Sequence, residues 1–192
     1  MSSQSHPLSD KECLKIATVR SGDTRVMLYP HLAECETLDD VFGRGGGEKA
    51  IILYVNSADD TTVSGHWVGL ARDLSNAPNE IRYIDPYGKP PDEMLKDYPR
   101  SWRSQSGQNE PFLTRLLKDW CEEDTSHRRV VFNDAGLQKS SKSINTCGRW
   151  AAFRLRHHTV SEEDFENTMK AAARARNVSP DELITEITNG LL

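Results

Sequence analysis

Several kinds of feature are missing from this chain of 192 residues, and each absence excludes a class of protein. No run of apolar residues is long enough to cross a bilayer. The first seven residues are polar and lack the basic-then-apolar pattern of a secretory signal. We therefore expect no membrane association, and a chain that stays in a reducing, intracellular compartment.

The charge balance and the cysteine spacing exclude further classes. A formal net charge of −5 without a basic run argues against a nucleic-acid partner held by phosphate contacts. The glycine-rich stretch 43–47 precedes a strand and has no following Gly-Lys-Ser/Thr, so it does not predict a nucleotide site. No CxxC spacing or clustered histidine accompanies the cysteines, so we expect no metal, cofactor or disulfide. The cysteines are Cys13, Cys35, Cys121 and Cys147.

The patterns that are present indicate one domain over 1–192, with a flexible lead at 1–8 and C-terminal helices at 161–189. Strands come first and helices later, which predicts an α+β fold with a central mixed or antiparallel sheet flanked by helices. The predicted strands are 24–28, 50–55, 65–72, 80–85 and 129–133. The predicted helices are 10–19, 37–42, 111–121, 147–158, 161–176 and 179–187, with a helical turn in 90–99 and polar loops at 101–109 and 134–146.

The stretch Ile144–Arg149 and the helix formers after it deliver Cys147 to the first turn of a buried helix. The positive end of the helix dipole favours a thiolate there, and a thiolate is the nucleophile of covalent catalysis. Gly148 leaves room beside the sulfur for a substrate backbone. A small buried core residue is the ordinary alternative for Cys147.

A histidine and an aspartate occupy matching ends of two neighbouring predicted strands. His66 begins the strand 65–72, and Asp85 ends the strand 80–85. The short turn between the strands predicts an antiparallel hairpin, in which the start of one strand lies beside the end of the other. His66 and Asp85 are therefore expected to be neighbours.

Together these residues suit thiol-mediated acyl transfer. His66 would accept the thiol proton and later protonate the leaving amine, while Asp85 fixes its tautomer. Gln138 is the predicted oxyanion donor, together with the backbone N–H of Cys147. Trp67 either walls a substrate groove or shields the histidine–aspartate pair. Taken singly, each residue apart from Cys147 has an ordinary explanation as a core, turn or surface residue, and only the joint pattern favours catalysis.

With these residues in place, the sequence resembles the adenain-type cysteine proteases, whose clan also includes the SUMO-deconjugating proteases. It is most similar to the small proteases of virophages and polinton-like viruses, over about Ile51 to Arg156. The segments that carry the resemblance are Gly65–Val68, Ile84–Gly88, Gln138 and Asn145–Arg149.

The resemblance implies a papain-like arrangement with the nucleophile last in the sequence. It also implies cleavage after small residues, typically glycine, in capsid or scaffold precursors, within the virion and the host cytoplasm. Gln138 lies nine residues before Cys147, further than is usual in the family, and Lys139–Lys142 is a candidate insertion. Asn133 and Asn145 are therefore alternative oxyanion donors. The peptide cofactor and DNA used by adenovirus members are not carried over to this acidic chain.

Other functions remain open on the same scaffold. An isopeptidase that removes ubiquitin-like modifiers would use the same residues but needs a docking surface for a folded modifier. A catalytically inert binding domain would not need His66, Asp85 and Cys147 together. An acetyltransferase would need a basic pocket for a phosphorylated cofactor, which the sequence does not indicate. The sequence leaves the oligomeric state open.

Overall fold

The computed structural model of the chain describes residues 7–43, 47–56, 65–123, 127–133, 135–139 and 144–192. Its centre is a five-stranded mixed sheet with the strand order β1-β2-β3-β4-β5. The central strand β3 is antiparallel to both β2 and β4, while β1 runs parallel to β2 and β5 runs parallel to β4. The strands are β1 (Thr24–Leu28), β2 (Lys49–Val55), β3 (Gly65–Asp73), β4 (Ala77–Ile84) and β5 (Arg129–Phe132).

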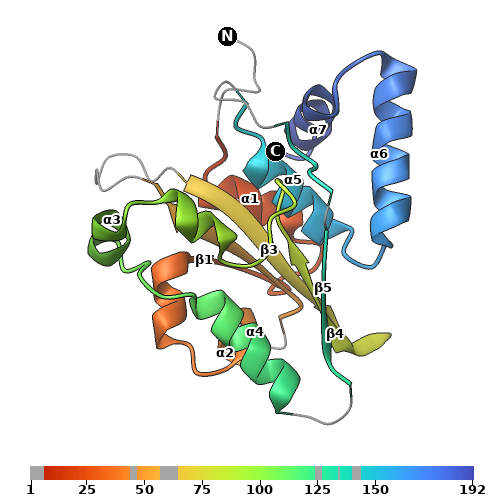
Figure 1. Cartoon of the computed structure of the whole chain (residues 1–192). Coiled ribbons are helices and arrows are strands. Elements are labelled where there is room, and N and C mark those ends of the chain that lie inside the picture. Colours follow the sequence, from red (N-terminus) through yellow and green to blue (C-terminus); the bar gives the residue numbers. More distant parts are fainter. Residues whose placement is uncertain (1–6, 44–46, 57–64, 124–126, 134, 140–143) are drawn as a thin grey trace.

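Helices cover both faces of this sheet (Figure 1). The predicted α+β class and the helix-flanked sheet are therefore confirmed. The α-helices are α1 (Asp10–Ala17), α2 (Leu38–Phe42), α3 (Arg100–Gln105), α4 (Phe112–Glu122), α5 (Cys147–Arg156), α6 (Glu162–Arg176) and α7 (Pro180–Asn189). Two 3-10 helices, η2 (Tyr29–Glu34) and η3 (Glu93–Asp97), complete the described elements. None of the helices in these ranges is long and apolar enough to span a membrane.

The interior strand β2, predicted as a buried strand, is covered on both faces because its apolar residues alternate between two cores. Ile52 and Tyr54 pack with η2, α2 and α4 on one face. Ile51 and Leu53 pack with α1 and α5 on the other. A continuous apolar run is typical of a strand that is covered on both faces, which is how the sequence predicted it.

The helix α5 packs directly on β3, and a glycine makes this close approach possible. A Cβ atom on Gly69 would lie only 2.9 Å from Cγ of Leu155. Trp150 projects from α5 into a third core formed with α6 and α7. The two C-terminal helices therefore brace the outer side of α5, as their amphipathic patterning predicted.

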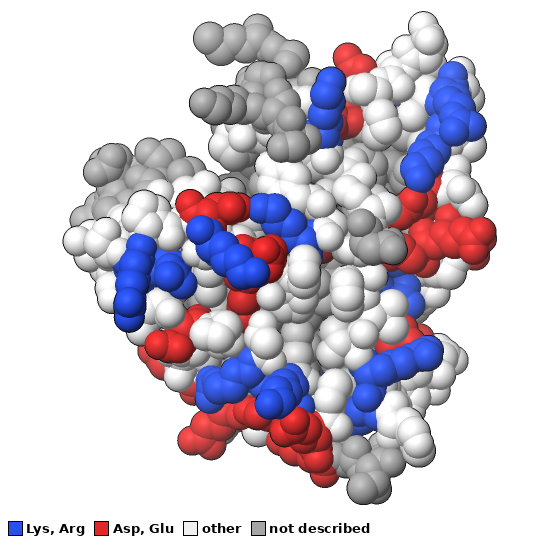
Figure 2. Space-filling view, in the orientation of Figure 1, with Lys and Arg blue, Asp and Glu red and all other residues white. Residues whose placement is uncertain are grey.

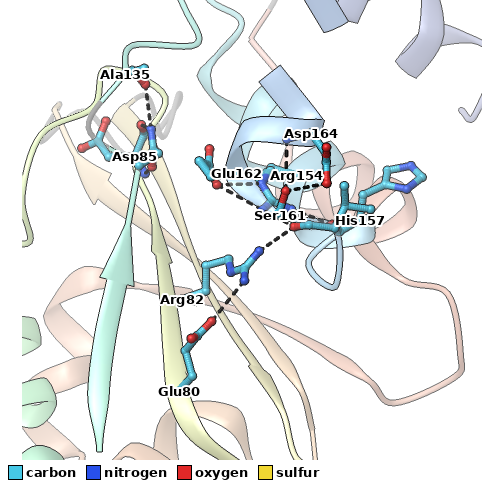
Figure 3. A network of polar contacts seen from close by, with 11 residues as sticks. Glu80, Arg82, Asp85, Ala135, Arg154, His157, Ser161, Glu162 and Asp164 are labelled. Atoms are coloured by element: carbon cyan, nitrogen blue, oxygen red, sulfur yellow. Dashed lines mark hydrogen bonds and ion pairs between the residues drawn. The ribbon is translucent and has the colours of Figure 1, made fainter. Parts of the chain in front are cut away.

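A buried arginine fixes the turn between α5 and α6. Arg154 is fully buried, with its guanidinium 3.1 Å from the Glu162 carboxylate and 2.8 Å from the Val160 carbonyl. Arg82 of β4 donates to the same Val160 carbonyl at 2.6 Å, so the sheet and the helical layer meet at one acceptor (Figure 3). A buried arginine is tolerated because its donors are satisfied in this way.

Three predictions about local structure need correction or qualification. The stretch 101–109, predicted as a loop, contains most of α3. None of the residues of α3 is buried, so this helix lacks the apolar periodicity that identifies a helix in a sequence. Leu8, placed in the flexible lead, is instead buried beside Cys147 and Trp67. The remainder of that lead, 1–6, and most of the glycine-rich stretch lie outside the described residues.

Replacing Gly69 by alanine tests the packing of α5 on β3. The added methyl group would overlap the Leu155 side chain, so we expect Gly69→Ala to lower the free energy of unfolding by about 1–3 kcal/mol. Urea unfolding followed by circular dichroism measures this change. Gly190→Ala is the matched control, because its Cβ would have no neighbour closer than 3.4 Å. Equal stabilities of the two variants would contradict the close approach.

Candidate active site

His66 and Asp85 meet as the hairpin geometry predicted. The antiparallel register of β3 and β4 pairs Gly69 with Ile84, which brings the first turn residue after β4 beside the start of β3. The Nε2 atom of His66 lies 3.0 Å from Oδ1 of Asp85. Both side chains are buried, and Asp85 has no exposed surface at all. A buried carboxylate of this kind orients the imidazole ring and selects its tautomer.

Asp85 is held in place by its own surroundings. Its Oδ1 atom also accepts the backbone N–H of Tyr87 at 2.7 Å. Asn133 accepts the backbone N–H of Asp85 at 2.9 Å and donates to the Asp85 carbonyl at 2.6 Å. The same Asn133 amide donates to the Ala135 carbonyl at 3.0 Å, beside Asp85 in Figure 3. Asn133 thus clamps the backbone of Asp85, and its contacts do not favour it as the alternative oxyanion donor, because both amide protons are engaged.

Cys147 is the first residue of α5, where the sequence placed it. Only 8% of its surface is exposed, and its sulfur lies 4.0 Å from the Gly65 carbonyl. Burial is the largest single influence and raises the pKa of the Cys147 thiol, while the hydrogen bond and the charge of the His66 ring lower it. Backbone N–H groups of Trp67 and Gly148 add to this lowering, so the pKa lies below its ordinary value. The thiolate is favoured at this position.

The histidine responds in the opposite direction. Burial lowers the pKa of the His66 imidazole, but its hydrogen bond to Asp85 and its contact with Cys147 raise it by more, to about 9. Nε2 is engaged by Asp85, and Nδ1 has no hydrogen-bond partner of its own among the described residues. Nδ1 is therefore the ring atom available to the sulfur. A lowered thiol pKa and a raised imidazole pKa together favour a thiolate–imidazolium pair at neutral pH.

Tyr87 covers the imidazole, a role that the sequence did not reveal. Its ring stacks on His66 with the centroids 4.7 Å apart and the planes 17° from parallel. Tyr87 thus shields one face of the ring, and both alternatives for Trp67 stay predictions. The available signal was the position of Tyr87 two residues after Asp85, where its N–H reaches the carboxylate.

A crevice of about 230 Å³ opens beside the sulfur. Trp67 and Gly148, the predicted substrate-binding residues, both line it. Packing also requires the glycine, because a Cβ on Gly148 would lie 2.9 Å from Cδ1 of Trp67 and 3.0 Å from the Cys13 sulfur, and its role beside a substrate backbone stays a prediction. The other residues that line the crevice are Pro7, Leu8, Asn56, Gly65, Asn145 and Cys147.

Gln138 lies close to this group but outside the crevice lining. Its Nε2 donates to the Ile144 carbonyl at 2.9 Å and lies 3.4 Å from the hydroxyl of Tyr87. Its side chain would have to give up a contact to reach an oxyanion, so this role stays a prediction. Asn145, the remaining alternative, lines the crevice beside Cys147. The first N–H groups of a helix also have no partner within the helix, which leaves donors beside Cys147.

The other thiols have the opposite electrostatic character. Burial raises the pKa of the thiol in each of Cys13, Cys35 and Cys121. No group of three or more His, Cys, Asp or Glu side chains in the described part of the chain is arranged to hold a metal ion. The chemistry that this arrangement supports is attack by the Cys147 sulfur on an electrophile, with His66 as the proton donor and acceptor.

Comparisons with known proteins agree with this arrangement at the level of fold. No family model matches the chain. The chain is 32% identical to the uncharacterized protein V9 of the Sputnik virophage over 173 residues, and this matched region covers 90% of each of the two chains. The crystal structure of the ASFV pS273R protease is similar with a TM-score of 0.53 and 15% identity, over 98% of this chain and 68% of that one. This chain therefore shares the fold of a viral protease.

The electrostatic difference between Cys147 and the other cysteines can be measured by alkylation. We expect iodoacetamide to label Cys147 faster at pH 7 than the other cysteines, because its lowered pKa gives it the larger thiolate fraction there. Labelling of the other cysteines should rise only as the pH approaches the ordinary thiol pKa of about 8.5 or exceeds it. Peptide mass spectrometry after timed labelling measures each rate. His66→Ala should slow Cys147 alone, and equal labelling of all the cysteines at neutral pH would contradict an activated thiol.

Proposed function

The chain belongs to the family of the virophage protein V9, and we propose that it is a cysteine endopeptidase that cleaves viral capsid or structural precursors after small residues such as glycine. The observation that carries the proposal is the hydrogen bond of the buried His66 ring to Asp85, together with the electrostatic interaction of that ring with the Cys147 thiol. The fold shared with a viral protease and the virophage relative support it. The adenain-type resemblance of the motifs is a third support.

The proposed reaction begins with the thiolate of Cys147. Its sulfur forms a bond to the carbonyl carbon of the scissile peptide, and the carbonyl oxygen becomes an oxyanion. The C–N bond then breaks, the leaving nitrogen takes the proton from Nδ1 of His66, and an acyl-enzyme remains. A water molecule next gives a proton to His66 and attacks the acyl carbon. The S–C bond breaks, the carboxylic acid product leaves, and the thiolate–imidazolium pair is restored.

The surroundings of the pair suit the other needs of this reaction. Asp85 stabilises the imidazolium form and keeps Nδ1 directed at the sulfur. The N-terminus of α5 offers backbone N–H groups and a favourable dipole to the oxyanion, with Gln138 or Asn145 as the side-chain donor. None of these steps needs a metal ion or an organic cofactor.

The crevice and the surface charge are compatible with a small residue at the site and with a protein substrate. Gly65, Gly148 and Trp67 line the crevice of about 230 Å³ beside the sulfur. Acidic and basic side chains are interspersed on the face shown in Figure 2, which is not the extended basic field that nucleic acid requires.

Substitutions of the three residues test the proposed reaction. We expect Cys147→Ala and His66→Ala to lower kcat on a glycine-containing peptide by on the order of 10⁶-fold, as for nucleophile and base in known triads. Asp85→Asn should cost less, on the order of 10⁴-fold, because the ring keeps a partner but loses the charge that stabilises its protonated form. Turnover is measured by mass spectrometry of the fragments from a purified capsid precursor and from a peptide.

Cys121→Ala is the matched control, because Cys121 lies on α4 with an unactivated thiol. It should retain wild-type turnover, and circular dichroism should show that all variants are folded. Unchanged turnover in Cys147→Ala would overturn the assignment. Cleavage of a ubiquitin-like conjugate in place of the capsid precursor would keep the mechanism and change the substrate to that of an isopeptidase.

A further inference from the structure

The second residue of α7 is a buried acid that the proposed reaction does not use. Asp181 is 3% exposed, although the first turn of a helix is normally solvated and rich in exposed acids. Its neighbour Glu182 follows the ordinary pattern, being exposed and bonded to Ser179 in a capping box. Burying a carboxylate is costly unless its oxygens accept hydrogen bonds, so the partners of Asp181 indicate what it does.

Among the described residues, the partners of the Asp181 carboxylate lie on the segment that carries Gln138 and Cys147. Its Oδ1 atom accepts the hydroxyl of Thr146 at 2.5 Å and the indole N–H of Trp150 at 2.9 Å. Its Oδ2 atom accepts the backbone N–H of Lys139 at 3.1 Å. No lysine or arginine in the described ranges forms an ion pair with it, so these hydrogen bonds and the N-terminus of α7 stabilise its charge.

These contacts hold the residues on both sides of the nucleophile. Thr146 directly precedes Cys147, and the peptide unit between them carries the Cys147 N–H. Trp150 lies one turn further along α5, where its backbone N–H donates to the Thr146 carbonyl at 2.9 Å. One carboxylate oxygen thus binds the start and the end of the first turn of α5. This turn sets the direction of both the sulfur and the first helical N–H groups.

The third contact ties the Gln138 loop to the same carboxylate. Lys139 follows Gln138, whose own backbone N–H donates to the Pro86 carbonyl at 2.9 Å. The loop is therefore fixed on one side to the Asp85–Tyr87 turn and on the other to α7. A residue that only filled space would not need two acceptor oxygens aimed at three donors.

We propose that Asp181 is a positioning residue of the active site, which holds the Cys147 turn and the Gln138 loop in register from the C-terminal helix. This inference rests on the proposed function for its catalytic meaning. Its structural content is independent, because the direction of the Cys147 sulfur toward His66 can be followed without any substrate. In Asp181→Asn one acceptor oxygen becomes an N–H₂ group, which would face a donor of Lys139, Thr146 or Trp150 and could not accept its hydrogen bond.

The test compares Asp181→Asn and Thr146→Val with the control Glu182→Ala. The control removes part of the α7 capping box without touching the site. We expect Asp181→Asn and Thr146→Val to slow alkylation of Cys147 at neutral pH by on the order of tenfold, and to lower kcat by on the order of 10- to 100-fold with KM little changed. Glu182→Ala should change neither rate per folded molecule, and Thr146→Ser should restore the wild-type values.

The double variant Asp181→Asn/Thr146→Val adds a second criterion. Because both changes act on the contacts of one carboxylate, the double variant should lose less than the product of the two single losses. Wild-type alkylation rates in folded Asp181→Asn and Thr146→Val would overturn the inference. A wild-type protein whose Cys147 alkylates rapidly but cleaves no precursor or peptide would overturn the proposed function alone.

Discussion

The interaction on which this site depends is the contact of one imidazole ring with a carboxylate on one side and a sulfur on the other. Asp85 is fully buried and binds Nε2 of His66, so the ring presents Nδ1 to Cys147. The raised pKa of His66 and the lowered pKa of Cys147 are two consequences of this single arrangement. Without the buried carboxylate, desolvation would favour the neutral ring and the neutral thiol.

The fold keeps these groups together by supporting each from a different element. The hairpin β3–β4 brings His66 and Asp85 to one edge, and Asn133 after β5 clamps the Asp85 backbone. The sulfur arrives from the opposite side on α5, which packs on β3 because Gly69 has no side chain. The C-terminal helices complete the support, since Trp150 packs among them and shares an acceptor with Thr146. The site is therefore built by the whole domain.

The features that the sequence revealed are those set by local rules. His66 and Asp85 were predicted to meet because two strands and a short turn define a hairpin, and Cys147 was placed at a helix start by the residues that follow it.

What could not be predicted depends on contacts between distant segments. Asp181 reads as an ordinary first-turn acid, and only the packing of α7 on α5 brings it to Thr146. Asn133 and Gln138 were both candidates for the oxyanion donor, because their distance from Cys147 along the sequence does not reveal which way a loop side chain points. The helix α3 was missed because it buries no face that would mark its periodicity.

The most direct test of the central claim is a nuclear magnetic resonance titration of the His66 ring in the wild-type protein and in Cys147→Ala. The account predicts that the wild-type imidazole remains protonated through neutral pH and titrates near 9. In Cys147→Ala the titration should move to lower pH, because burial still favours the neutral ring and the thiolate no longer opposes it. A wild-type ring that titrates near the ordinary histidine value of about 6.5, unchanged by loss of the sulfur, would contradict the thiolate–imidazolium pair.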